Sequence, residues 1–253
     1  MQFMRKRSVW LFASVMAAFV ACDDDDNKEQ PQAITTEEAA VMASSSLASN
    51  SSGIAATSQQ SADGAEDVMA SNESGRVAAC GVSQNIDLSG SSPNGATIIW
   101  SYDFSYKFRL NCTDEAPKSI SVDLSYNGTY DGPRAKFDHS GVSQVDVTGL
   151  AKTDDNFVLA GSYKRSDSFS IKEGEKKSGS SSIDYTITAI NVDKEGHDIV
   201  DGTAKFVLKG TVTGKGEFNY EGNVNFKGND RAELQIKGET YIVNTISGEV
   251  SKK

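Results

Sequence analysis

The stretch Ile98–Cys112, IIWSYDFSYKFRLNC, decides the fold. Large apolar side chains occupy every second position, and Ser, Asp, Lys, Arg and Asn fill most of the positions between them. A period of two over this length indicates a β-strand with one buried face. At ~3.3 Å per residue the strand would run roughly 50 Å, well above the usual ~17–20 Å. Its buried face would consist of Ile98, Trp100, Tyr102, Phe104, Tyr106, Phe108, Leu110 and Cys112.

The same alternation recurs through residues 78–253, where turn residues separate the runs. Ala135–Phe137 and Val145–Val147 suggest two short strands, and the pattern ends near Ile246. Connections this short force neighbouring strands to pair antiparallel. We therefore predict an all-β domain, an antiparallel up-and-down meander of about ten or eleven strands. Its sheet would be strongly twisted or curled, as a half-barrel, a barrel or a sandwich. The tail Glu249–Lys253 lacks the terminal aromatic strand typical of membrane barrels.

Residues 22–77 have a different composition, rich in Ser, Ala, Gln, Glu and Asn and without an aromatic residue. Such a segment buries too little surface to offset its ordering entropy, which favours a flexible tether. Thr35 and Glu38 have the spacing of a capping box, and Ile54–Met69 is rich in Ala, so two short helices are expected. In the alternative, this segment docks on the sheet as a cap through Val41, Met42, Leu47, Ile54, Val68 and Met69.

The N-terminus is typical of an export signal. Arg5–Arg7 is basic, Val9–Val20 is a short apolar run, and Ala21 is a small residue before a cleavage point. About a dozen apolar residues are too few to span ~30 Å of hydrocarbon. Because Cys22 follows Ala21, the chain resembles bacterial lipoproteins, in which this cysteine is acylated. The resemblance implies a signal peptide over residues 1–21 and a membrane anchor, with fatty acids such as palmitate, at Cys22.

Four aspartates, Asp23–Asp26, follow the cysteine at once. An acidic run at this place resembles the surface-export signal of Bacteroidota-type lipoproteins. In enteric-type systems an aspartate there resembles an inner-membrane retention signal instead. The long acidic run and the departure from leucine at Phe19 favour the first pattern. We therefore expect an outer-membrane, lipid-anchored protein at the cell surface, with a periplasm-facing location as the alternative.

Two cysteines remain once Cys22 is assigned to the anchor. An exported chain enters an oxidising compartment, where pairing is the default for such residues. We predict a disulfide between Cys80 and Cys112, which would join the start of the β domain to the end of the long strand.

The sequence offers little for catalysis. His139 and His197 are its only histidines, and no GxSxG serine motif is present. Zinc would need more His and Cys ligands than the chain contains. The dense carboxylate groups, Asp154–Asp155 and the set Asp193, Glu195 and Asp198, lie in turns. We predict no catalytic residue, metal or cofactor. The net charge of −10 argues against a nucleic-acid partner.

These observations predict a non-enzymatic, lipid-anchored envelope protein that binds or presents an unknown ligand or protein partner at the outer-membrane surface. One alternative is a carrier of an apolar ligand, held in a cavity of the curled sheet. A second alternative is a hydrolase that uses two carboxylates. The candidate ligand-binding residues are Trp100, Tyr102, Phe104, Tyr106 and Phe108, on the aromatic face of the long strand.

Overall fold

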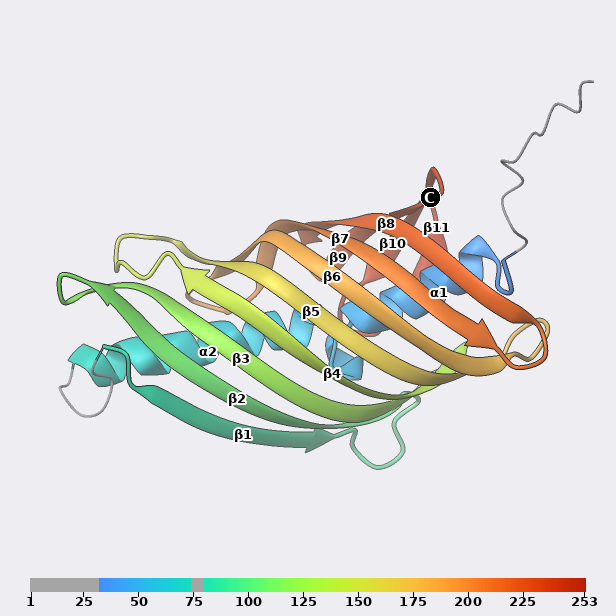
Figure 1. The fold of residues 1–253 in the computed structure, drawn as a ribbon, viewed down its shortest axis with the longest axis horizontal. Helices are drawn as coiled ribbons and strands as arrows, with labels where there is room; N and C mark the ends of the chain where they lie inside the picture. Colours follow the sequence, from blue (N-terminus) through green and yellow to red (C-terminus); the bar gives the residue numbers. More distant parts are fainter. Residues whose placement is uncertain (1–31, 74–79) are drawn as a thin grey trace, which may run out of the picture. The chain divides into compact units, whose positions relative to one another are not determined.

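The computed structural model describes residues 32–73 and 80–253, and a single sheet dominates these residues (Figure 1). Its eleven strands follow the order of the chain, and each is antiparallel to the next. This confirms the predicted meander, as a curled sheet that is not closed into a barrel. The strands are β1 (Ser83–Ser91), β2 (Ile99–Thr113), β3 (Ala116–Asp131), β4 (Ala135–Thr148), β5 (Asn156–Ile171), β6 (Ser178–Asp193), β7 (Ile199–Val212), β8 (Gly216–Gly228), β9 (Arg231–Ile236), β10 (Glu239–Asn244) and β11 (Val250–Lys252).

The long strand predicted around Phe104 is β2, and both of its neighbours pair along it. The sequence suggests a break at Ala116–Pro117, but β3 already begins at Ala116. The chain instead reverses at Asp114 and Glu115, which both have positive φ. A two-residue turn of this kind matches the twist of the strands that it joins.

Residues 135–148 form the single strand β4, although the sequence suggests two short strands there. The inward positions between Phe137 and Val145 hold His139, Gly141 and Ser143. These residues do not continue the apolar pattern, so they hide a strand whose side-chain alternation is unbroken. A further strand, β11, lies in the tail that follows the last predicted strand. The number of strands agrees with the prediction because the merged pair in β4 and the additional strand β11 offset each other, and the start of β3 also differs.

Two helices and a short 3-10 turn precede the sheet: α1 (Thr36–Leu47), η1 (Ser49–Ser51) and α2 (Ile54–Glu73). The predicted capping box begins α1. The Glu38 amide donates to Thr35 Oγ1 over 3.2 Å, and the Thr35 amide donates to Glu38 Oε2 over 2.7 Å. Nine consecutive residues of α1, from Ala39 to Leu47, are buried. A helix buried on all sides must be enclosed by other elements.

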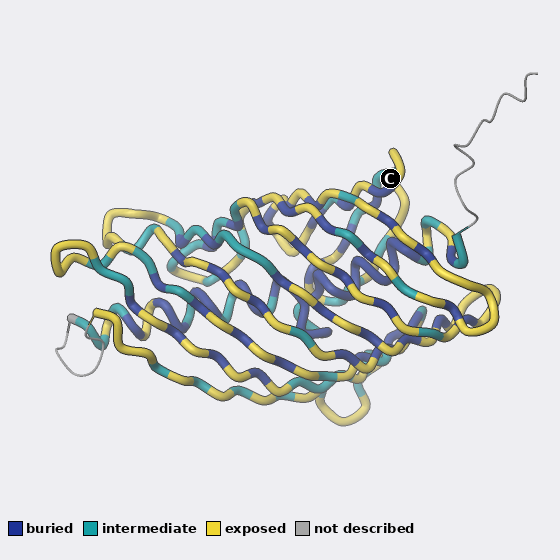
Figure 2. The backbone as a smooth tube through the Cα atoms, in the orientation of Figure 1, coloured by how far each residue is buried: buried dark blue, intermediate teal, exposed yellow. Residues whose placement is uncertain are grey.

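The curled sheet supplies that enclosure, because α1 and α2 lie along its concave side (Figures 1 and 2). Apolar residues of both helices and of all strands from β2 to β10 form one core. The flexible tether is therefore wrong for residues 36–73, and the docked cap is what the structure shows. Of the six residues predicted to dock, five are buried and Met69 packs against the core. The many small residues of both helices, mainly Ala and Ser, allow this segment to fit closely inside the sheet.

The predicted signal peptide, residues 1–21, lies outside the described residues, as do Cys22 and Asp23–Asp26. Neither helix among the described residues is long and apolar enough to cross a membrane.

Candidate functional site

The aromatic face of β2 is mostly covered. Phe104, Tyr106 and Phe108 are buried, whereas Trp100 and Tyr102 are half-buried. Helix α2 passes directly over this face at Gly64, where a Cβ atom would lie 2.2 Å from Phe108 Cζ. The aromatic row is thus chiefly a packing surface for α2, and the predicted ligand platform is not exposed along most of its length.

The predicted disulfide is present between Cys80 and Cys112, with the two Cα atoms 5.7 Å apart. The adjacent Gly81 amide donates to the Leu110 carbonyl over 2.8 Å. Together these contacts fix the start of the β domain to β2, close to the point where the chain enters the sheet from α2.

A charged pair that the sequence analysis missed lies inside the sheet. Arg165 and Asp167 are inward-facing residues of β5, and Arg165 Nε donates to Asp167 Oδ1 over 2.7 Å. Their side chains are almost completely buried. Burial raises the pKa of Asp167, against the opposing effect of Arg165. Burial also disfavours the guanidinium, but Asp167 and two tyrosines keep the pKa of Arg165 above its usual value. The only sequence signal for this pair was its position, because Arg165 and Asp167 occupy alternate residues on the inward-facing side of β5.

Arg165 also holds the turn between the helices. Its Nη1 donates to the Ser51 carbonyl over 2.8 Å and to the Ser45 carbonyl over 3.3 Å. Ser45 lies in the last turn of α1, where backbone carbonyls lack partners within the helix. A cation is favourable at this negative end of a helix. The buried charge therefore has a structural role, because it joins β5 to the end of α1.

His139 lies beside this network. Its side chain is buried, and burial, followed by the charge of Arg165, lowers its pKa from 6.5 to about 2. A Cβ atom at Gly128, which faces His139 across β3 and β4, would lie 2.7 Å from His139 Nε2 and 3.0 Å from Ser52 Oγ. Among the described residues, neither ring nitrogen of His139 has a hydrogen-bond partner, and neither does Ser52 Oγ. His139 is thus a neutral core histidine, not an exposed acid or base.

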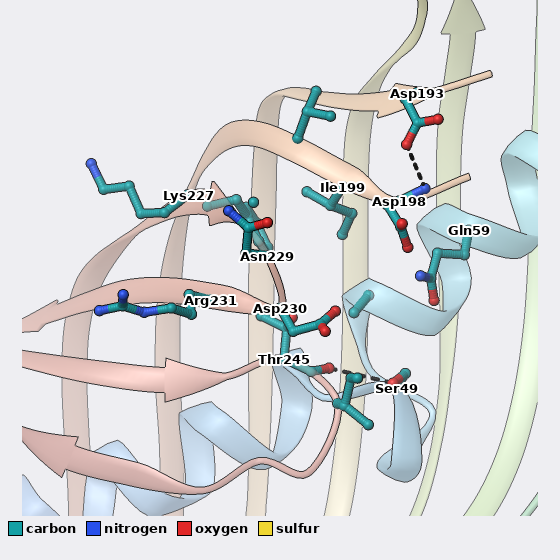
Figure 3. A pocket seen from close by; sticks show the side chains of 15 residues that line it. Ser49, Gln59, Asp193, Asp198, Ile199, Lys227, Asn229, Asp230, Arg231 and Thr245 are labelled. Atoms are coloured by element: carbon teal, nitrogen blue, oxygen red, sulfur yellow. Dashed lines mark hydrogen bonds between the residues drawn. The ribbon is translucent and has the colours of Figure 1, made fainter. Parts of the chain in front are cut away.

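An open cleft of about 380 Å³ lies where the turns at one end of the sheet meet η1 and the start of α2 (Figure 3). Ligand sites commonly occupy clefts of about 300–1,000 Å³. The turn between β6 and β7 supplies one wall and the turn between β8 and β9 another. Backbone hydrogen bonds hold the third wall, because the Ser49 amide donates to the Thr245 carbonyl over 2.8 Å.

Carboxylates and amides supply hydrogen-bond acceptors to the cleft, beside apolar side chains such as Val200 and Ile246. The carboxylates of Asp198 and Asp230 point into it from two different turns, and the Gln59 amide points into it from α2 (Figure 3). The side chains of Lys227 and Arg231 extend away from the centre. Such a lining suits a small polar molecule that carries hydroxyl or amino groups.

Asp193 shapes one wall of the cleft instead of facing a ligand. Its carboxylate accepts hydrogen bonds from the backbone amides of Glu195, Gly196 and Asp198, at 3.0, 2.7 and 3.1 Å. These backbone hydrogen bonds, that of Gly196 first, lower the pKa of Asp193. The sequence placed this carboxylate group in a turn, and the structure confirms that role for Asp193. The position of Asp198 in the cleft depends on the turn that Asp193 organises.

The other carboxylate group belongs to the turn between β4 and β5. Asp154 Oδ2 accepts a hydrogen bond from the Ala151 amide over 3.1 Å. The Asp155 carbonyl accepts one from the Lys194 amide over 3.2 Å, which joins this turn to the turn after β6. In the region of the chain that the structure describes, no group of three or more His, Cys, Asp or Glu side chains is arranged to hold a metal ion.

Sequence reasoning missed the cleft because its walls come from segments far apart in the chain. Asp230 lies in a two-residue turn with Asn229, and both residues have positive φ, which is typical of tight hairpins. That turn was visible in the sequence, but its position opposite Asp198 and Gln59 follows only from the curl of the sheet. No protein-family model matches this chain, and neither a curated protein nor a solved structure matches it.

Proposed function

We propose that this protein is a non-enzymatic, lipid-anchored binding module of the bacterial cell envelope that takes a small polar ligand in the cleft of Figure 3. The observation that carries the proposal is the convergence of Asp198, Asp230 and Gln59 on one open cleft. Their oxygens accept hydrogen bonds from hydroxyl and ammonium groups. The proposed ligand is therefore small and rich in hydrogen-bond donors.

The proposed location rests on the N-terminal sequence. The basic and apolar leader, Cys22 and the acidic run Asp23–Asp26 resemble a lipoprotein that is exported to the outer-membrane surface. Stable anchoring needs more than one acyl chain, at ~0.8 kcal/mol per buried CH₂. With the anchor at Cys22, the module would be held at the membrane and present its cleft to the surrounding medium.

The carrier alternative has less support. It requires the aromatic face of β2 to line a cavity for an apolar ligand, yet α2 packs against that face at Phe108. A carrier would have to displace its own helix, at the expense of the buried surface that holds the helix in place.

Ligand binding can be tested with the full-length protein in phosphatidylcholine nanodiscs. Its melting temperature would be measured against a panel of mono- and disaccharides, amino acids and polyamines. We expect at least one compound to raise it, since a ligand that binds only the folded state stabilises it. The variants Asp198→Asn and Asp230→Asn should lose the shift. Asp184→Asn, which changes an exposed carboxylate on β6, should retain it.

The outcomes separate the alternatives. Consumption of a stabilising disaccharide, lost in Asp198→Asn, would replace binding by hydrolysis. Shifts that survive both cleft variants would contradict the assignment of the cleft. For the location, protease added to intact cells should degrade the domain, whereas protection would favour the periplasm-facing alternative. A Cys22→Ser variant should lose incorporation of labelled palmitate.

A further inference from the structure

A second hollow of about 350 Å³ lies between α2 and the first two strands of the sheet. The accessible part of its floor consists of Ile86 and Leu88 of β1, which are only partly buried. Tyr106 and Phe108 of β2 lie beneath, with their rings stacked 5.5 Å apart and each only 1% exposed. Since β1 is an edge strand, no further strand of the described sheet covers this side of the floor. We call this hollow the α2–β1 groove.

The rim of the α2–β1 groove is acidic. Asp63, Glu66 and Asp67 line it from α2, and a spacing of three and four residues places them on one helical face. Like charges at this spacing destabilise a helix. Among the described residues, His197 is the one basic side chain in the lining, with Nε2 3.1 Å from Glu66 Oε2 and Nδ1 in contact with Asp63. One imidazole cannot neutralise three carboxylates.

An unpartnered polar group lies beneath this rim. Tyr106 is 1% exposed and lines the groove, and within residues 32–73 and 80–253 its hydroxyl has no hydrogen-bond partner. The hydroxyl is close enough to the helix for Asp63 to contribute, after burial and two tyrosines, to the raised pKa of Tyr106. A buried hydroxyl without a partner costs about 1–3 kcal/mol, so a group that pairs with it would be stabilising.

We propose that the α2–β1 groove is a binding site for a small organic cation: a compact apolar or aromatic body that carries one ammonium group. The apolar body lies on the partly buried side chains of Ile86 and Leu88. The ammonium group lies between the α2 carboxylates and donates a hydrogen bond to the hydroxyl oxygen of Tyr106. This site is separate from the cleft of Figure 3, which is lined by different residues.

The probe for this proposal is tryptamine, which combines an aromatic body with an ammonium group. Isothermal titration would use the full-length protein in phosphatidylcholine nanodiscs at low ionic strength, with empty nanodiscs subtracted. Tryptophol replaces the ammonium group by a hydroxyl group, and indole-3-acetate replaces it by a carboxylate. We expect tryptamine to bind about tenfold or more tightly than tryptophol, to bind more weakly as salt screens the rim, and indole-3-acetate not to bind.

Matched variants test the assignment. The triple variant Asp63→Asn, Glu66→Gln and Asp67→Asn should weaken tryptamine binding about tenfold or more. Tyr106→Phe should weaken it several-fold without destabilising the free protein, because the hydroxyl has no partner to lose. Asp230→Asn alters only the other cleft and should leave tryptamine binding unchanged. Equal affinity for tryptamine and tryptophol, undiminished binding by the triple variant, or no binding of tryptamine would each overturn the proposal.

Discussion

Arg165 shows how one buried charge can determine the packing of several segments. Its guanidinium contacts Asp167, the end of α1 and the turn before α2, and its Cζ lies 5.6 Å from the ring centre of Phe137. Removing one partner of a buried ion pair leaves the other charge without compensation, which is usually more damaging than removing both.

We therefore expect Arg165→Met to lower the free energy of unfolding by about 3–5 kcal/mol. The double variant Arg165→Met with Asp167→Leu should recover some of this loss, because it removes the stranded carboxylate. Urea denaturation followed by circular dichroism measures both values. If the double variant were as unstable as the single one, the hydrogen bonds to the helix turn would outweigh the ion pair.

His139 makes stability depend on acidity. Its pKa is about 2 in the folded protein and about 6.5 when unfolded, so below pH 6.5 the unfolded chain binds the proton first. The part of the free energy of unfolding that comes from the neutral His139 is fully present above pH 6.5. It is lost by up to ~1.4 kcal/mol per pH unit as the pH falls toward 2.

The test is the free energy of unfolding from pH 7.5 to pH 4.5. In His139→Gln the dependence on pH should be shallower, since glutamine does not titrate. His197→Gln leaves the buried imidazole of His139 in place, so the pH dependence that His139 contributes should remain. An unchanged slope in His139→Gln would contradict a buried, neutral histidine.

At the scale of elements, α2 fits the sheet because the side chains on its inner face are small. Gly64 lies against Phe108, and the buried residues Ala62 and Ala65 flank it on the same helix. We expect Gly64→Ala to lower stability by about 1–3 kcal/mol, since the clash with the ring outweighs the ~1 kcal/mol gain in helix propensity. Thermal or urea unfolding measures this loss.

A smaller neighbour in place of the aromatic ring is the control. In a Phe108→Leu background the same Gly64→Ala change should cost less, because the added methyl group no longer meets a ring. Equal costs in both backgrounds would show that the helix and the strand are not in contact at this point.

The elements also show what the sequence could and could not predict. The period-two pattern predicted β2 and most strands, because their inward residues are apolar. It failed in the middle of β4, where the inward residues include His139 and Ser143, since these face a polar interior that no local pattern reveals. Helix α2 was underestimated because its many Ala and Ser residues resemble a linker until the partner surface on β2 is known.

At the scale of the whole molecule, a covalent link restrains the first strands. Cys80 and Cys112 are separated by 32 residues in the sequence. By chain-entropy reasoning, removing their bond with Cys80→Ala and Cys112→Ala should lower stability by about 3–4 kcal/mol. Denaturation of the double variant, compared with wild type under oxidising and reducing conditions, measures this value. Wild type under reducing conditions should match the variant, and a variant as stable as the oxidised protein would contradict the prediction.

The same scale explains why the candidate sites were not predicted. Carboxylates such as Asp63 and Asp230 are ordinary in a sequence, and each was consistent with a solvated helix face or a turn. They form sites only in the folded protein, because the curled meander brings α2 beside β1 in one place and beside the turn after β8 in another. The fold class can be predicted from local sequence patterns, whereas the two clefts depend on segments that are far apart in the chain.

The position of α1 inside the sheet has a consequence for folding while the chain is being synthesised. This helix is near the beginning of the chain, yet Ser44 Oγ donates to the Gly248 carbonyl over 2.9 Å and Tyr220 donates its hydroxyl hydrogen to the Ile34 carbonyl over 2.6 Å. Several of the residues that enclose α1 are therefore synthesised long after the helix itself. The helix cannot reach its final packing until β8 and the residues after β10 have also been synthesised. A chain cut before β8 would leave the buried surface of α1 exposed, and such fragments should be removed quickly by cellular proteases.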